Sequence, residues 1–87
     1  MEYSIEFSPL FIKMYRNLGT ALQDDVDEKV ELLKHKKNHG RLRVHKLGGQ
    51  LKGIYSFSVN YKVRVTFVLV KRRIILLERV GTHDEVY

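Results

Sequence analysis

Hydrophobic side chains recur every three or four residues in the first half of the chain and mainly every second residue in the second half. Spacing of three to four places apolar residues on one face of a helix, whereas alternation places them on one face of a strand. A short alternating run at residues 3–7 comes before the helical part. The pattern therefore predicts one strand, then helices, then several more strands.

The expected start and end of the first helix are marked by small and cyclic residues. Ser8 is a suitable N-cap, and Pro9 follows it as the residue that a first helical turn tolerates best. Apolar residues at helical spacing then continue as far as Gly19, which is a typical helix terminator. We expect this apolar stripe to face the core.

A second helix is expected to begin at Thr20, because Thr20 and Gln23 fit a capping box. Gly40 is its predicted stop. The basic run at residues 34–37 would then lie in the last turn, where cations suit the helix dipole. We therefore interpret that run as mainly structural.

Four further strands are expected after the helices. Alternating segments joined by turn-forming residues cover residues 41–47, 54–59, 62–70 and 74–80. Helices and strands that are segregated in this way are typical of an α+β fold, and 87 residues suffice for one core. We expect a single domain over residues 1–87, with the helices covering one face of an antiparallel four-strand meander.

The other face of this meander is expected to be uncovered and polar. Its side chains are basic residues, a histidine and hydroxyls, namely Arg41, Arg43, His45, Ser56, Ser58, Arg64 and Thr66. This face is the candidate site.

Charge favours a polyanionic partner for that face. The chain has 16 Lys and Arg against 10 Asp and Glu, a net charge of +6, and Glu78 is the one acid between Lys34 and Arg79. Lys and Arg displace counterions from a phosphate backbone, so nucleic acid is the natural partner class. A basic surface that is merely solvated is the alternative.

Several other classes are disfavoured. Without cysteine there are no disulfides or thiolate metal sites, and the spacings of the four histidines do not form a ligand set. The glycines of "LGGQLKG" lack the helix that a phosphate-binding loop requires. No leader or bilayer-length apolar run is present, so we expect a cytoplasmic protein with no membrane partner.

The last residues carry the most distinctive side chains. His83 follows the final strand, and an imidazole titrates close to neutral pH, which suits proton transfer. Arg64 interrupts an apolar strand, so it either faces a polar surface or pairs with Glu78. Tyr87 could contribute to the same site or simply anchor the C-terminal segment.

Two segments, "HKLGGQLKGIYSFSVNYKVRVTF" and "VGTHDEVY", resemble the RelE/YafQ branch of the RelE/ParE superfamily, the toxins of type II toxin–antitoxin pairs. The resemblance extends over nearly the whole chain. It implies a metal-independent, cofactor-free endoribonuclease that cleaves mRNA on the ribosome, with the RNA 2′-hydroxyl as nucleophile. It also implies a cognate acidic antitoxin that holds the toxin inactive.

By matching position, the resemblance implies that His83 transfers protons, that Arg64 clamps the phosphate, and that Tyr87 stacks on a base or orients the nucleotide. The expected RNA path comprises Arg41, Arg43, His45, Lys46 and Lys52. The chain departs from YafQ-type members at two positions, where Ser58 and Lys62 stand in place of further proton-handling groups. The exact acid and base roles therefore stay open.

Two rival functions remain at this point. A ParE-like protein would poison DNA gyrase by binding, without nuclease chemistry, but usually lacks the ending "GTHDEVY". A non-catalytic RNA-binding module would use only the basic face, and its function would survive replacement of His83.

Overall fold

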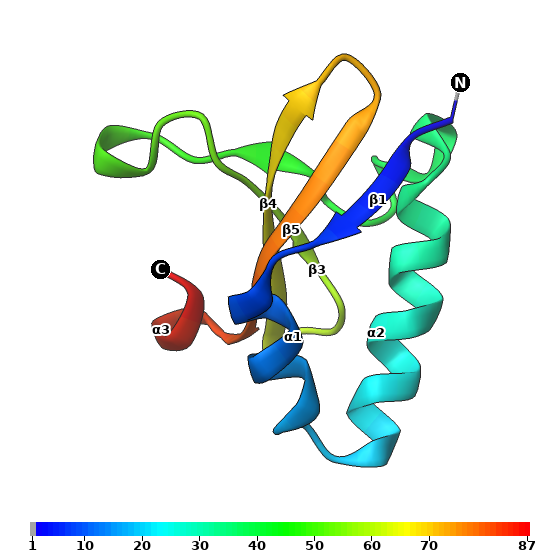
Figure 1. The fold of residues 1–87 in the computed structure, drawn as a ribbon, viewed down its shortest axis with the longest axis vertical. Helices are drawn as coiled ribbons and strands as arrows, with labels where there is room; N and C mark the ends of the chain where they lie inside the picture. Colours follow the sequence, from blue (N-terminus) through cyan, green and yellow to red (C-terminus); the bar gives the residue numbers. More distant parts are fainter. Residues whose placement is uncertain (1) are drawn as a thin grey trace.

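The computed structural model describes residues 2–87 and contains one mixed five-stranded sheet with helices (Figure 1). The strands lie in the order β1-β5-β4-β3-β2; β1 is parallel to β5, and the other pairs are antiparallel. The elements are β1 (Ser4–Phe7), α1 (Pro9–Arg16), α2 (Thr20–Leu33), η1 (Lys36–Asn38), β2 (His45–Lys46), η2 (Gly49–Leu51), β3 (Tyr55–Ser58), β4 (Val63–Lys71), β5 (Ile74–Thr82) and α3 (His83–Val86). The α+β prediction, with a meander after two helices, is confirmed.

The core lies between the sheet and helices α1 and α2. Phe11 of α1 and Val26, Val30 and Leu33 of α2 are buried against strand residues that include Phe57, Val65, Ile75 and Leu77. Burial of these apolar side chains is the main stabilising contribution to the fold. None of the helices within residues 2–87 is long and apolar enough to cross a bilayer.

Helix α1 begins as the sequence predicts. The Ser8 hydroxyl oxygen accepts a hydrogen bond from the Phe11 N–H at 2.9 Å, and the same hydroxyl donates to the Glu78 carbonyl of β5 at 3.0 Å. Pro9 occupies the first turn. One side chain therefore caps the helix and fixes it to the sheet.

The predicted capping box of the second helix is wrong. Gly19 is the N-cap of α2, in extended conformation, and no side chain caps that end. The Gln23 amide instead donates to the Tyr15 carbonyl at 3.0 Å. Gln23 thus stabilises the end of α1, because the connection between the helices is short enough for the two to share polar groups.

A second side-chain bond joins the two helices. The Tyr15 hydroxyl donates to Asp27 Oδ1 at 2.6 Å. This hydrogen bond, together with desolvation and the negative charges of Asp27 and Asp24, raises the pKa of Tyr15 to about 12, because each disfavours the phenolate.

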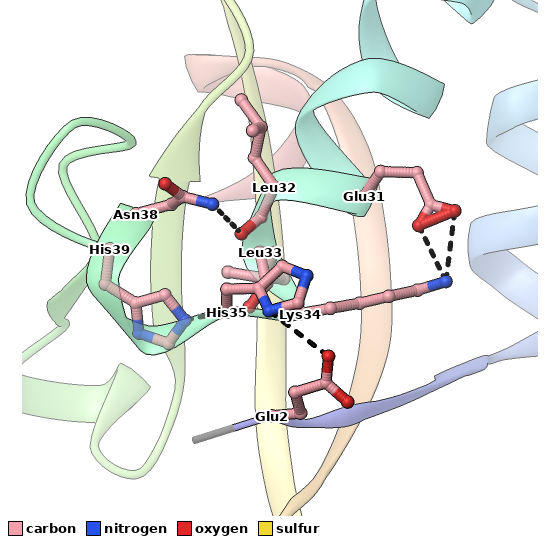
Figure 2. A network of polar contacts seen from close by, with 8 residues as sticks. All are labelled: Glu2, Glu31, Leu32, Leu33, Lys34, His35, Asn38 and His39. Atoms are coloured by element: carbon pink, nitrogen blue, oxygen red, sulfur yellow. Dashed lines mark hydrogen bonds and ion pairs between the residues drawn. The ribbon is translucent and has the colours of Figure 1, made fainter.

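Helix α2 ends earlier than predicted, at Leu33 rather than near Gly40. Figure 2 shows why: Asn38 Nδ2 donates to the Leu32 carbonyl at 2.9 Å, and His39 Nε2 to the Leu33 carbonyl at 2.8 Å. These side chains satisfy carbonyls that would otherwise be left open at a helix end. The basic run at residues 34–37 lies beyond the helix, contrary to the prediction.

The predicted strand at residues 41–47 is also mostly wrong. Only His45–Lys46 pairs, with β3. The chain makes a turn first, with Leu42 N–H bound to the Asn38 carbonyl and Arg43 in the left-handed region at φ 58°. Arg41 and Arg43 therefore project from a turn rather than from the sheet face.

Candidate functional site

The strand register collects polar side chains in two rows on the sheet face opposite α1 and α2. The first row crosses β2, β3, β4 and β5, with one residue from each strand paired to the next: His45, Ser56, Thr66 and Arg79. In the second row, Ser58 pairs with Arg64 and Arg64 with Gly81. Because neighbouring residues along a strand point to opposite faces, each row lies on one side of the sheet.

The centre of this face is covered, contrary to the prediction that it is open. Ser56 and Thr66 are 0% and 2% exposed. Helix α3 returns over the face, with Val86 buried and Tyr87 half-buried. The Tyr87 hydroxyl forms a short hydrogen bond with the Ser56 hydroxyl. The C-terminal segment is therefore fixed to the middle of the sheet.

Arg64 is partly buried on the same face of the sheet. Its Nη1 donates to the Asn60 carbonyl at 2.7 Å and reaches the Val63 carbonyl at 3.5 Å. Of the two alternatives left by the sequence, pairing with Glu78 does not occur, and within residues 2–87 no carboxylate pairs with Arg64. The Asn60 carbonyl holds one end of the guanidinium, which orients the group and leaves its positive charge without a counter-ion.

His83 opens α3 two residues after Gly81, the strand partner of Arg64. Its side chain is 73% exposed, and its Nδ1 lies 3.5 Å from Asp84 Oδ1. The Tyr87 ring meets the imidazole edge-on, with centroids 4.5 Å apart and planes at 88°. One helical turn thus places the His83 ring against Tyr87, and His83 follows two residues after the strand partner of Arg64.

The turn that bears His83 requires a glycine. The Thr82 N–H donates to Glu85 Oε1 at 2.7 Å, which draws the Glu85 side chain back over β5. A Cβ at Gly81 would lie 2.7 Å from the same oxygen and 3.0 Å from the Glu85 Cβ. Gly81 therefore permits the close approach that fixes the start of α3.

The predicted RNA-path residues are exposed, and they come from a turn, from both faces of β2 and from a loop. His45 lies in the row of Ser56, and its Nδ1 donates to the Arg43 carbonyl at 2.8 Å. Lys46 points to the opposite sheet face, 6.0 Å from the Tyr55 ring. Lys52 follows η2 in the loop between β2 and β3, and Arg41 and Arg43 lie in the turn before β2.

Three features of the site were not found from the sequence. Ser56 was interpreted as an exposed strand serine, whereas it holds Tyr87. Asn60 orients Arg64 through its backbone carbonyl, and its side chain accepts from the N–H groups of Lys62 and Val63, both at 2.8 Å. An asparagine between two strands signals a turn of this kind. Glu85 stands three residues after Thr82, which is the spacing of a capping box, and the structure forms that box at the start of α3.

Metal-ligating side chains do not cluster in the described structure. Within residues 2–87, no three His, Asp or Glu side chains are placed so that they could share a metal ion.

No protein family and no curated protein sequence matches the chain. Solved structures do. YafQ from E. coli has a TM-score of 0.81 and 19% identity over 99% of both chains. The RelE–RelB complex from Pyrococcus horikoshii has a TM-score of 0.72 and 21% identity over 94% of this chain and 96% of that one.

A third similar structure is the RelBE2 toxin–antitoxin complex from Mycobacterium tuberculosis, with a TM-score of 0.73 and 18% identity over 95% of this chain and 100% of that one. Taken with the strand order and the helix pair, these likenesses define the class: the chain has the fold of toxin–antitoxin toxins. In particular it is the RelE/YafQ-type toxin fold, as the sequence resemblance implied.

Proposed function

We propose that the protein is the toxin of a type II toxin–antitoxin pair and that it cleaves mRNA on the ribosome, in the cytoplasm. The observation that carries this proposal is that His83, in contact with Tyr87, follows two residues after the strand partner of Arg64 in a RelE/YafQ-type fold. The net charge of +6 suits an RNA substrate.

In the proposed reaction, the 2′-hydroxyl of the RNA attacks the adjacent phosphorus. The P–O5′ bond breaks, and the products are a 2′,3′-cyclic phosphate and a free 5′-hydroxyl. One proton leaves the 2′-oxygen and one reaches the 5′-oxygen, so the step balances without a cofactor. His83 carries one of these transfers, and its exposed imidazole is accessible to a bound strand.

Arg64 stabilises the pentacoordinate phosphorane in this scheme. Its guanidinium has no carboxylate partner within residues 2–87, so its charge is available to a phosphate. Tyr87 acts through position: its hydroxyl is engaged by Ser56, and its ring contacts His83. A base stacked on the outer part of the ring would be held in line with the scissile bond.

The proposed partner is an acidic antitoxin. Two of the similar structures are complexes of a RelE-type toxin with its antitoxin, RelE–RelB and RelBE2. We expect an antitoxin segment either to cover Arg64 or to displace the four-residue helix that bears His83. A complex that left both regions open and undistorted would contradict neutralisation by occlusion.

The test is to express the protein in cells, to follow their growth, and to map the 5′ ends of their mRNA. Induced cells should stop growing, and primer extension on ribosome-bound mRNA should show new 5′ ends. Arrest without any mRNA cleavage, accompanied by gyrase-dependent DNA breaks, would instead establish the gyrase-poison alternative. The purified protein should reproduce the cleavage on ribosomes programmed with a defined mRNA.

A further inference from the structure

A hollow of about 510 Å³ lies beside the candidate site, on the same face of the sheet. It is enclosed by the start of α1, by the loop between β2 and β3, and by α3. In Figure 1 that loop and α3 project from the same side of the sheet. Tyr87 belongs both to the hollow and to the site with His83.

Most walls of the hollow are apolar. Leu47, Leu51 and Ile54 approach from the loop, Leu10 from α1, and Val86 from α3. Flat aliphatic and aromatic surfaces of this kind favour a planar ring, and unpaired RNA bases are commonly stacked on side chains in such sites. The space exceeds what one purine needs.

Two adjacent charged side chains stand in this apolar setting. Thr66 pairs with Arg79, but the next residue, Phe67, pairs with Leu77, so a bulge leaves Glu78 as the extra residue. At such a bulge, consecutive side chains can share one side of the sheet, and both Glu78 and Arg79 line the hollow. Within residues 2–87 neither is in an ion pair.

The pair matches one base better than the others. A carboxylate binds best to two adjacent N–H donors, and only guanine offers these, at N1 and N2. A guanidinium binds two adjacent acceptors, which guanine offers at O6 and N7. The two edges of guanine are neighbours in the ring, as Glu78 and Arg79 are neighbours in the chain.

We infer that this hollow is a guanine-binding site, in which Glu78 accepts from N1–H and N2–H while Arg79 donates to O6 and N7. The inference rests on the proposed action on RNA and adds the base that the protein prefers beside the scissile phosphate. The shared Tyr87 connects the recognised base to His83.

The test is an NMR titration of the folded protein with GMP, IMP, AMP, CMP and UMP, and with inorganic phosphate as the probe for charge alone. GMP should bind most tightly and should shift the amide signals of Leu51, Thr66 and Tyr87. IMP lacks the N2 amino group and should bind roughly tenfold more weakly. Phosphate alone should leave the Leu51 signal in place.

Three variants locate the effect. Glu78→Gln should abolish the difference in affinity between GMP and IMP. Arg79→Met should weaken the binding of GMP by a similar factor, roughly tenfold. Glu6→Gln, on an exposed β1 position, is the matched control and should behave like the parent. One-dimensional spectra of each variant establish that it is folded.

Equal affinity for all five nucleotides, or signal changes confined to residues outside the hollow, would overturn the inference. A preference for another base would overturn the guanine assignment. If the parent cleaves ribosome-bound mRNA without base preference, the site is wrong and the proposed function stands. If it prefers GMP but cleaves no mRNA, the proposed function is wrong and the site stands.

Discussion

His83 combines high exposure with a fixed orientation. Its side chain is 73% exposed, yet the Tyr87 ring lies against it and the first turn of α3 sets its backbone. Such a residue contributes little to packing, so its replacement tests chemistry rather than folding.

We expect His83→Ala to lower the rate of cleavage of ribosome-bound mRNA about 10²- to 10⁴-fold, the usual range for a positioned acid or base. The free energy of unfolding should change little. His35→Ala is the matched control, because His35 pairs with Glu2 at the end of α2, away from α3. Parent-like cleavage by the His83 variant would show that another group transfers the proton.

Tyr87 and Ser56 are joined in the structure, because their hydroxyls bind each other. We expect Tyr87→Phe and Ser56→Ala to slow cleavage by similar factors, and the double variant to be no slower than either. Residues that act through one shared bond show this kind of non-additivity. Additive losses in the same cleavage assay would mean that the Tyr87 hydroxyl acts elsewhere. Tyr87→Ala should be slower than Tyr87→Phe, since stacking is lost as well.

At the scale of elements, the start of α3 depends on the Glu85 side chain, which packs over Gly81 and accepts a hydrogen bond from the Thr82 N–H. Gly81→Ala should displace Glu85 and break its bond to the Thr82 N–H, at a cost of about 1 kcal/mol for one hydrogen bond. Amide exchange at Tyr87, whose N–H donates to the His83 carbonyl, should become faster. Gly40→Ala is the control, because a Cβ there meets nothing within 4 Å. Unchanged exchange in the Gly81 variant would contradict this account of α3.

The link between α1 and α2 predicts a pH dependence. Because folding raises the pKa of Tyr15 to about 12, from about 10 in the unfolded chain, the neutral phenol stabilises the folded state. This stabilisation is complete below about pH 10 and is lost as the pH rises towards 12. Chemical denaturation at several pH values should show this loss in the parent but not in Tyr15→Phe. Tyr61→Phe, at an 83% exposed position, should retain it.

The long elements could be predicted from the sequence because each carries a sustained period. Residues 41–47 alternate as well, yet only two of them pair in the sheet. What decides that segment is the end of α2, where Asn38 and His39 bind helix carbonyls and pull the chain into a turn. Contacts of this kind depend on the folded geometry and leave no periodic signal.

In the candidate site, too, some features follow from the sequence and others depend on contacts made only in the folded chain. Arg64, His83 and Tyr87 were predicted as site residues from the family resemblance, and their roles stay predictions. The structure places His83 against Tyr87 and pairs Arg64 with Gly81. The burial of Ser56 and Thr66 could not be anticipated, because it requires α3 to turn back over the sheet. A four-residue helix is too short to have a hydrophobic pattern of its own.

At the scale of the whole molecule, charge should govern association with RNA. Arg43→Glu and Lys52→Glu should each weaken ribosome binding without unfolding the domain, because exposed charges contribute little to stability. Affinity of the parent should fall as salt rises, in proportion to the phosphates contacted. Lys71→Glu makes the same charge change at the far end of β4 and should have a smaller effect. Binding that is insensitive to salt would indicate a protein partner.

The parallel pairing of β1 with β5 has a consequence for synthesis. Ser8, next to β1, binds the carbonyl of a residue 70 positions later in the chain. A nascent chain therefore cannot complete its sheet until β5 has left the ribosome, and closure of so long a loop delays folding. Until then β1 has no strand partner, and the helices lack the Ile75 and Leu77 side chains of β5 from their core. The polypeptide therefore lacks the assembled sheet until β5 has emerged from the ribosome.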